Sequence, residues 1–219
     1  ILRGNEEDIK IHIDASKGPV YIGEEVTIKA NVVIEGPVFI DDHVIIHPAF
    51  VRGNTSIGHH GRVGGEIEGT IMLPYSNKYH AGFVGHSYIG EWVNLGAMTT
   101  TSDLKNTYGH VQLNVGREKI ETGQQFLGSF IGDHVKLGIG SLLLTGSVVG
   151  FGAMLATGGL VPKWIPSFSW ITSSKSERYN LKKFLETTQI VWSRRGRNLL
   201  PHDRVFLETL YRLTEAELS

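Results

Sequence analysis

The polar side chains of this chain gather most densely in one short stretch, residues 75–88. It holds Lys78, His80 and His86 within nine residues. Histidine is the side chain best suited to take a proton near neutral pH, so His80 is a candidate general base. The competing interpretation is a solvent-facing turn residue, because the chain has 10 histidines and a single one is weak evidence. The surrounding residues must decide between the two.

Three histidines could instead hold a metal ion. His80, His86 and His110 together would suffice for a zinc site with one open position. The chain has no cysteine, which excludes a thiol nucleophile and a thiolate metal site. Gly-x-Ser-x-Gly and Gly-rich nucleotide-binding signatures are also absent from the sequence, so this segment predicts neither a serine hydrolase nor nucleotidyl transfer. The main interpretation below requires no metal.

A six-residue repeat must position these side chains. Three runs carry an apolar residue at every sixth position: Ile22, Ile28, Ile34, Ile40 and Ile46; Phe83, Ile89 and Leu95; and Ile131, Leu137, Leu143, Val149, Leu155 and Val161. This period is not helical, but it fits short strands joined by tight turns and stacked as a solenoid. Three hexads would close one triangular coil of a parallel β-helix, with Ile22 beside Ile40 and Ile131 beside Val149. A β-sandwich is the alternative, although its strands usually recur every 8–12 residues or so.

The repeat divides the chain into three parts. Residues 1–17 are a polar lead-in or linker, residues 18–161 form about six or seven coils, and residues 162–219 form a connector and helices. Within the β-helix, the polar segment 102–125 breaks the repeat. We expect it to project as a loop, and long ordered loops are usually functional.

Two helices are expected after the connector. Apolar residues at helical spacing predict the first at about 177–195, capped by Ser174 or Ser176, and the second begins near Pro201. A solenoid exposes its last coil, so these helices would cover the open end. A helical pair that binds a partner is the alternative.

Composition limits the possible partners. The net charge is −1, with no basic excess, so nucleic acid is not an expected partner. No membrane-spanning stretch or signal peptide is visible, and a cytoplasmic location is expected. Since the chain opens on Ile1 rather than Met, we expect further sequence upstream.

The residues around His80 resemble one family. Residues 76–97 read SNKYHAGFVGHSYIGEWVNLGA. This is similar to the acetyltransferase half of the bifunctional glucosamine-1-phosphate acetyltransferase/N-acetylglucosamine-1-phosphate uridylyltransferases, and to related sugar nucleotidyltransferases. Those enzymes carry a histidine followed at the same spacing by Ile-Gly-x-x-Val-Asn-x-Gly-Ala. The resemblance extends over about residues 20–161 and is specific over residues 76–97.

The resemblance implies an all-β fold, a left-handed parallel β-helix of hexapeptide repeats with a C-terminal α-helical cap. It also implies a homotrimer with active sites between adjacent prisms, and acetyl-CoA as co-substrate. His80 takes the place of the general base, and Asn94 that of a residue hydrogen-bonded to the acceptor. The positions assigned to the acetyl-CoA side are Ala97, Gly138 and Ala156.

The acceptor site departs from the family pattern. Thr70 stands in the segment where the family has a lysine that holds the sugar phosphate, and Asp103-Leu-Lys105 replaces Asn-Tyr-Asp. Phe83 replaces a tyrosine and lacks its hydroxyl group. The residues expected to bind substrate are Arg52, Lys78, Phe83 and Lys105.

The sequence therefore predicts an acyltransferase that moves an acetyl group from acetyl-CoA to an amino-sugar phosphate or nucleotide sugar. It would form the C-terminal part of a sugar nucleotidyltransferase. The second hypothesis is a non-catalytic trimerisation and regulatory domain of such an enzyme, which the missing phosphate lysine favours. The third is a zinc-dependent enzyme like the carbonic anhydrases that share this helix. The ungapped match from His80 to Ala97 favours the first.

Overall fold

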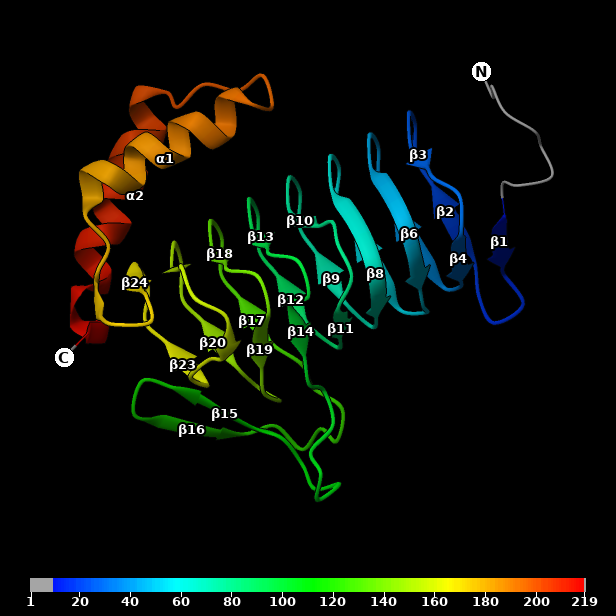
Figure 1. The fold of residues 1–219 in the computed structure, drawn as a ribbon, viewed down its shortest axis with the longest axis horizontal. Helices are drawn as coiled ribbons and strands as arrows, with labels where there is room; N and C mark the ends of the chain where they lie inside the picture. Colours follow the sequence, from blue (N-terminus) through cyan, green and yellow to red (C-terminus); the bar gives the residue numbers. More distant parts are fainter. Residues whose placement is uncertain (1–9, 219) are drawn as a thin grey trace.

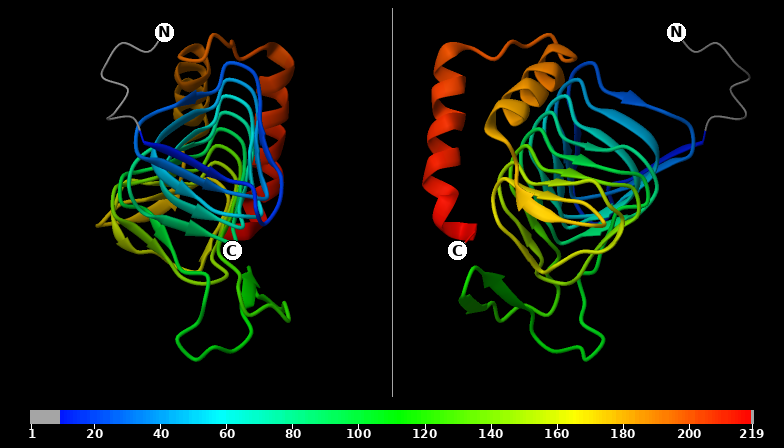
Figure 2. Two further views of the ribbon diagram at one scale, coloured as in Figure 1. Left: turned by 90° about the vertical axis from the view of Figure 1, so that its right-hand side faces the viewer. Right: turned by 60° about the vertical axis from the view of Figure 1, so that its left-hand side comes forward.

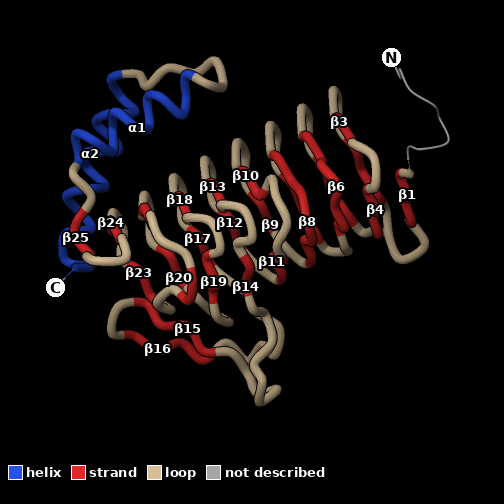
Figure 3. Tube along the Cα trace, in the orientation of Figure 1, coloured by secondary structure: helices blue, strands red, loops and turns tan. Residues whose placement is uncertain are grey.

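The computed structural model describes residues 10–218 as a β-solenoid followed by two helices. Most coils have three short strands separated by tight turns (Figure 3), while β6 (Ile45–Val51) and β8 (Arg62–Glu68) each continue from the second wall into the third. Seen along their axis, the coils lie over one another (Figure 2). None of the described helices is long and apolar enough to cross a membrane.

The first wall of the solenoid is one parallel sheet of eight strands, one from each coil. The strands follow the order β2 (Val20–Ile22), β5 (Val38–Ile40), β7 (Thr55–Ile57), β9 (Ile71–Met72), β12 (Tyr88–Ile89), β17 (Phe130–Ile131), β20 (Val148–Val149) and β23 (Trp164–Ile165). The expected register is confirmed, because Ile22 pairs with Ile40 and Ile131 with Val149.

The second wall is built in the same way. Its strands are β3 (Thr27–Ile28), the start of β6 (Ile45–Val51), the start of β8 (Arg62–Glu68), β10 (Asn77–Lys78), β13 (Asn94–Leu95), β18 (Lys136–Leu137), β21 (Met154–Leu155) and β24 (Ser169–Ile171). Eight coils exceed the six or seven expected. The last strands of both walls, β23 and β24, lie beyond residue 161, where the repeat was expected to end.

The third wall closes each coil. Its strands are β1 (Ile11–Asp14), β4 (Val32–Glu35), the ends of β6 and β8, β11 (Phe83–Gly85), β14 (Thr100–Thr101), β19 (Ser141–Leu143) and β22 (Gly159–Leu160). Because β1 pairs with β4 in parallel, coil structure already begins inside the segment expected to be a lead-in.

The interior of the prism is filled by stacked aliphatic side chains. In the first wall the inward residues from Ile40 to Ile165 are almost wholly buried. The inward file of the second wall is broken once, at Lys78, which pairs in register with Val63. A charged side chain thus occupies a position where the neighbouring coils have aliphatic residues.

The corner between the first and second walls carries an aromatic stack. The corner residue adopts a left-handed backbone conformation in successive coils, including His60 (φ 57°), Tyr75 (φ 60°) and Trp92 (φ 58°). The Tyr75 ring stacks on Trp92 with ring centroids 4.2 Å apart, and on His60 at 5.0 Å. These rings form a continuous aromatic ridge along the solenoid.

The segment expected as a loop at 102–125 contains an antiparallel hairpin, β15 (Gln112–Val115) and β16 (Glu118–Glu121). It projects below the later coils (Figure 1). Lys163 Nζ donates a hydrogen bond to the Gln112 carbonyl oxygen, 3.4 Å away, which ties the hairpin to the end of the solenoid.

The first helix begins later than the sequence predicts. β25 (Ser176–Arg178) pairs antiparallel with β24, so α1 (Leu181–Ser193) is capped by Asn180 rather than by Ser174 or Ser176. α2 (Pro201–Leu213) starts at the expected proline and continues into η2 (Thr214–Leu218). Phe184 and Leu207 pack with Phe168 of the last coil, as an end cap requires.

α1 also runs back along the solenoid towards earlier coils. Phe184, near its start, packs edge-on against His134, and Trp192, near its end, stacks on Trp92 one coil earlier, with ring centroids 5.2 Å apart. The helix is therefore both a cap and a cover for one side of the prism (Figures 1 and 2).

Candidate active site

One file of outward-facing residues runs down the second wall. The parallel ladder places Arg62 beside Asn77, Asn77 beside Asn94, Asn94 beside Lys136, and Lys136 beside Met154. Adjacent strands lie about 4.8 Å apart. Side chains that are far apart in sequence therefore form one polar strip.

The end of α1 lies across this strip and encloses a groove of about 610 Å³, which we call the α1 groove. Arg195 Nη2 donates to Asn77 Oδ1 at 2.8 Å, which links the connector after α1 to the strip. The groove is lined by Arg62, Tyr75, Asn77, Tyr79, His80, Trp92, Asn94, Leu95, Gly96, Ala97, Lys136, Ile139, Met154, Thr187, Val191, Arg194 and Arg195.

The structure brings together three of the residues that the sequence singled out. His80, Asn94 and Ala97 all line the α1 groove. His80 is exposed at the corner after β10, and Ala97 follows β13 in the next coil. The backbone N–H of Ala97 donates to no other residue in the described part of the chain, so it is free to bind an oxygen atom. An imidazole and a free amide donor thus share one concave site.

Lys78 is not placed to contact a substrate. Its side chain is 2% exposed and points into the prism, where Nζ donates to the carbonyl oxygens of Gly64 at 2.9 Å and His80 at 2.5 Å. Burial lowers the pKa of Lys78 to about 8. The ammonium group instead ties two corner segments together and fixes the backbone at His80.

Arg52 and Phe83 lie on the third wall, outside the α1 groove. Arg52 Nη1 contacts Glu68 Oε2 at 2.9 Å and Glu66 Oε1 at 3.4 Å. Two carboxylates against one guanidinium leave this surface without a positive charge for a phosphate group. Phe83 pairs in register with Glu66, which places its ring on the same surface.

The remaining expected ligand-binding residues do not line the α1 groove. Lys105 is in the inserted segment, where Nζ donates to the His110 carbonyl oxygen at 3.1 Å. Gly138 and Ala156 follow β18 and β21, so they continue the corner of Ala97 towards later coils. A Cβ on Gly138 would lie 2.5 Å from the Thr157 carbonyl oxygen, so only glycine fits there.

The three histidines considered for zinc are not gathered. Among residues 10–218, no group of three His, Asp or Glu side chains is placed to hold a metal ion. His86 Nδ1 lies 2.8 Å from Asp103 Oδ2, and this carboxylate orients its ring. Within the described part of a single chain, the donor set for the zinc hypothesis is therefore not assembled.

Sequence reasoning missed several residues of the groove. Arg62, Asn77 and Lys136 could have been found by stepping from Asn94 to the matching position in neighbouring coils. Burial lowers the pKa of Lys136 to about 7, and Nζ donates to the Trp92 carbonyl oxygen at 2.6 Å. Arg194 and Arg195 carried no such signal, because nothing in the repeat predicts where α1 lies.

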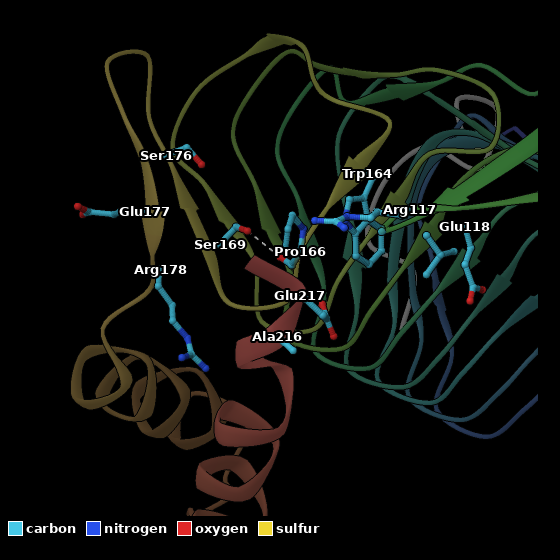
Figure 4. A pocket seen from close by; sticks show the side chains of 12 residues that line it. Arg117, Glu118, Trp164, Pro166, Ser169, Ser176, Glu177, Arg178, Ala216 and Glu217 are labelled. Carbon is cyan, nitrogen blue, oxygen red and sulfur yellow. Dashed lines mark hydrogen bonds between the residues drawn. The ribbon is translucent and has the colours of Figure 1, made fainter. Parts of the chain in front are cut away.

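A second hollow, of about 1200 Å³, lies at the end of the solenoid. It is lined by side chains of the hairpin tip, the last coil and the C-terminal segment (Figure 4). Its Glu217 accepts a hydrogen bond from the Ser167 backbone N–H at 2.8 Å, and its Arg178 pairs with Glu215 at 3.2 Å. These polar groups stabilise the junction, and no histidine lines the hollow.

Comparison with curated proteins finds similar sequences among bifunctional enzymes. A bifunctional sugar-1-phosphate nucleotidylyltransferase/acetyltransferase of Sulfurisphaera tokodaii is 36% identical over 162 residues, covering 72% of this chain and 39% of that protein. Bifunctional protein GlmU of Methanococcus vannielii is 38% identical over 165 residues, covering 68% of this chain and 40% of that protein. The chain thus spans about two fifths of the length of these relatives. No protein-family model matches the chain.

Among solved structures, the polySia-specific acetyltransferase NeuO is similar with a TM-score of 0.55. The sequences are 14% identical, and the match covers 80% of this chain and 82% of that chain. At this level of identity the likeness concerns the fold alone.

Proposed function

Because the chain is a hexapeptide-repeat β-solenoid homologous to part of the bifunctional sugar-1-phosphate nucleotidylyltransferase/acetyltransferases, we propose that it transfers an acetyl group from acetyl-CoA to an amino sugar. The acceptor would be an amino-sugar phosphate or a nucleotide sugar. The observation that carries the proposal is the convergence of His80, Asn94 and Ala97 in the α1 groove. The coils would wind in the left-handed sense that the resemblance implies.

His80 would act on the acceptor amine. As the amine nitrogen attacks the thioester carbonyl carbon, the imidazole accepts the proton that the nitrogen loses. The carbon–sulfur bond then breaks, and CoA leaves as its thiol after taking up a proton. Removing such a base typically costs about 10²–10⁴ in rate. Asn94, on the adjacent coil face, would hydrogen-bond the acceptor.

The free N–H of Ala97 would bind the developing oxyanion. A backbone donor held by a rigid coil stabilises that charge without reorganising during the reaction. Acetyl-CoA would then lie along the corner that continues through Gly138 and Ala156. The hydrogen bond from the Gly140 N–H to the Ala97 carbonyl oxygen, 2.7 Å long, holds this corner in place.

A homotrimer is part of the proposal. The outward file of the first wall is apolar: Tyr21 is 53% exposed, Phe39 43%, Ile71 50% and Tyr88 39%. The ladder aligns these side chains along the wall. The file is interrupted once, by the polar residue Ser56 between Phe39 and Ile71. Exposed apolar surface of this extent marks an interaction site, and a subunit interface would bury it.

The non-catalytic alternative has one observation in its favour. The pairing of Arg52 with Glu66 and Glu68 removes the positive charge that the family pattern would offer a sugar phosphate on the third wall. In this alternative the solenoid would serve as a trimerisation and regulatory module beside a nucleotidyltransferase domain. The bifunctional names of the relatives are compatible with either role.

The two roles are separated by an activity assay. Purified protein is incubated with acetyl-CoA and a panel of amino sugars, including glucosamine-1-phosphate, and free CoA is measured. Acceptor-dependent release of CoA supports the acetyltransferase. A folded trimer that releases no CoA with any acceptor supports the regulatory module.

A further inference from the structure

The α1 groove is lined by cationic side chains and by no acidic one. Arg62 comes from the second wall, while Arg194 and Arg195 come from the end of α1 and the connector that follows it. Lys136 adds a fourth basic group, which burial leaves partly protonated near neutral pH because its pKa is lowered to about 7. Like charges that converge on one cavity raise its affinity for anions.

These arginines have no carboxylate partner. Within residues 10–218, no acidic side chain lies within 4.0 Å of Arg62, Arg194 or Arg195, in contrast to Arg52 and Arg178. Arg62 Nε is buried without an acceptor, and Arg195 donates to the neutral amide of Asn77. Arg62 Nε is thus a buried cationic donor without a partner, whereas such donors are normally paired.

Arg62 and Arg195 also lie close to one another. Burial first, and then the nearby charges of Arg62 and Arg194, lower the pKa of Arg195. Repulsion between guanidinium groups costs stability unless an anion lies between them. The link from Arg195 to Asn77, which neighbours Arg62 in the ladder, keeps the two groups together.

We propose that Arg62 and Arg195 bind a phosphate group of the molecule that occupies the α1 groove. Guanidinium groups suit this ligand because their planar donors match phosphate oxygens in pairs. α1 would then be a substrate-binding element as well as a cap. The identification of the ligand as a substrate rests on the proposed acetyltransferase function.

The position of this site favours the acceptor as the source of the phosphate. Arg62 lies two coils before Asn94, about 10 Å along the ladder. The acetyl-CoA corner runs from Ala97 towards later coils, in the opposite direction. A sugar 1-phosphate with its amine at His80 could therefore direct its phosphate towards Arg62. The diphosphate of CoA is the other phosphate group that this site could bind.

Binding is measured by titration calorimetry on the full chain, with glucosamine-1-phosphate, glucosamine and CoA as separate probes. Arg62→Gln and Arg195→Gln remove the charges, while Arg204→Gln, on the exposed face of α2, is the matched control. Each charged hydrogen bond removed should weaken phosphate binding about 10- to 100-fold. We expect this loss with glucosamine-1-phosphate in both groove variants, and no change in the control.

The probes distinguish the two sources of phosphate. If the groove variants lose affinity for CoA alone, the anion site is retained but binds a phosphate of the co-substrate. Unchanged affinities for both phosphorylated probes in both groove variants, with native melting and sedimentation, would overturn the proposal. The calorimetry needs no turnover, so an inactive protein that still binds glucosamine-1-phosphate through Arg62 and Arg195 would refute the acetyltransferase and retain the site.

Discussion

Trp192 of α1 stacks on Trp92 of the solenoid, with ring centroids 5.2 Å apart. Trp192 also faces His134 at 6.1 Å, so its ring takes a place within the aromatic ridge of the corner. This contact holds the end of α1, and with it Arg195, over the second wall. The helix therefore contributes to the groove because one aromatic side chain fixes it there.

Replacing Trp192 with alanine should loosen α1 from the solenoid. Truncation of a large aromatic side chain at such a contact costs about 3 kcal/mol. We expect faster amide hydrogen exchange in α1 and the 194–200 connector, with little change in the coils. Ile190→Ala is the matched control, because Ile190 is 62% exposed on the same helix. Equal exchange in both variants would show that the stack does not hold the helix.

Lys78→Met should remove a pH-dependent contribution to the stability of the protein. The folded pKa of Lys78, about 8, lies below its ordinary value of 10.5, so the unfolded chain binds more protons between these values. The stability of the wild type therefore rises with pH across this window. The stability of the variant has no contribution from the titration of Lys78. The stability of the variant relative to the wild type should therefore fall by about 3 kcal/mol between pH 7 and pH 10.5.

Denaturant unfolding at a series of pH values measures this effect. Methionine fits because its unbranched chain can fill the same space. Lys182→Met, on the exposed face of α1, should show no such pH dependence. A stability difference between Lys78→Met and the wild type that is the same at every pH would contradict the assignment of the charge to the interior.

The solenoid could be predicted from the sequence because its cause is local. One apolar residue per hexad fills the prism, and the pairing of Ile22 with Ile40 follows directly from the spacing. The burial of Lys78 could not be predicted in this way, because in the sequence alone an inward lysine resembles a substrate-binding lysine. The structure buries the Lys78 side chain and directs its ammonium group to backbone carbonyl oxygens.

The candidate site was only half predictable. His80, Asn94 and Ala97 lie within 18 residues of one another, and the ladder brings their coils together. Arg195 reaches Asn77 across 118 residues, through a helix whose path depends on the Trp192 contact. No spacing within the repeat encodes that contact, so the basic side of the groove could not be inferred from the sequence.

A charge placed on the apolar file of the first wall should break the proposed trimer. Phe39→Lys combined with Tyr88→Lys would bury two ammonium groups in the interface, while in the monomer both positions are exposed. We expect the double variant to sediment as a monomer with native secondary structure. Phe206→Lys, on the exposed face of α2, should remain trimeric. A wild-type chain that sediments as a monomer at micromolar concentration would remove the basis for this prediction.

The rate of CoA release by the His80→Ala variant tests the proposed role of His80 as the general base for acetyl transfer. Because His80 is exposed and lies outside the apolar core, the variant should keep the melting temperature and sedimentation of the wild type. His202→Ala, an exposed histidine of α2, is the control and should retain full activity. We expect His80→Ala to lower kcat by about 10²–10⁴. A His80→Ala protein that releases CoA as fast as the wild type would contradict this role.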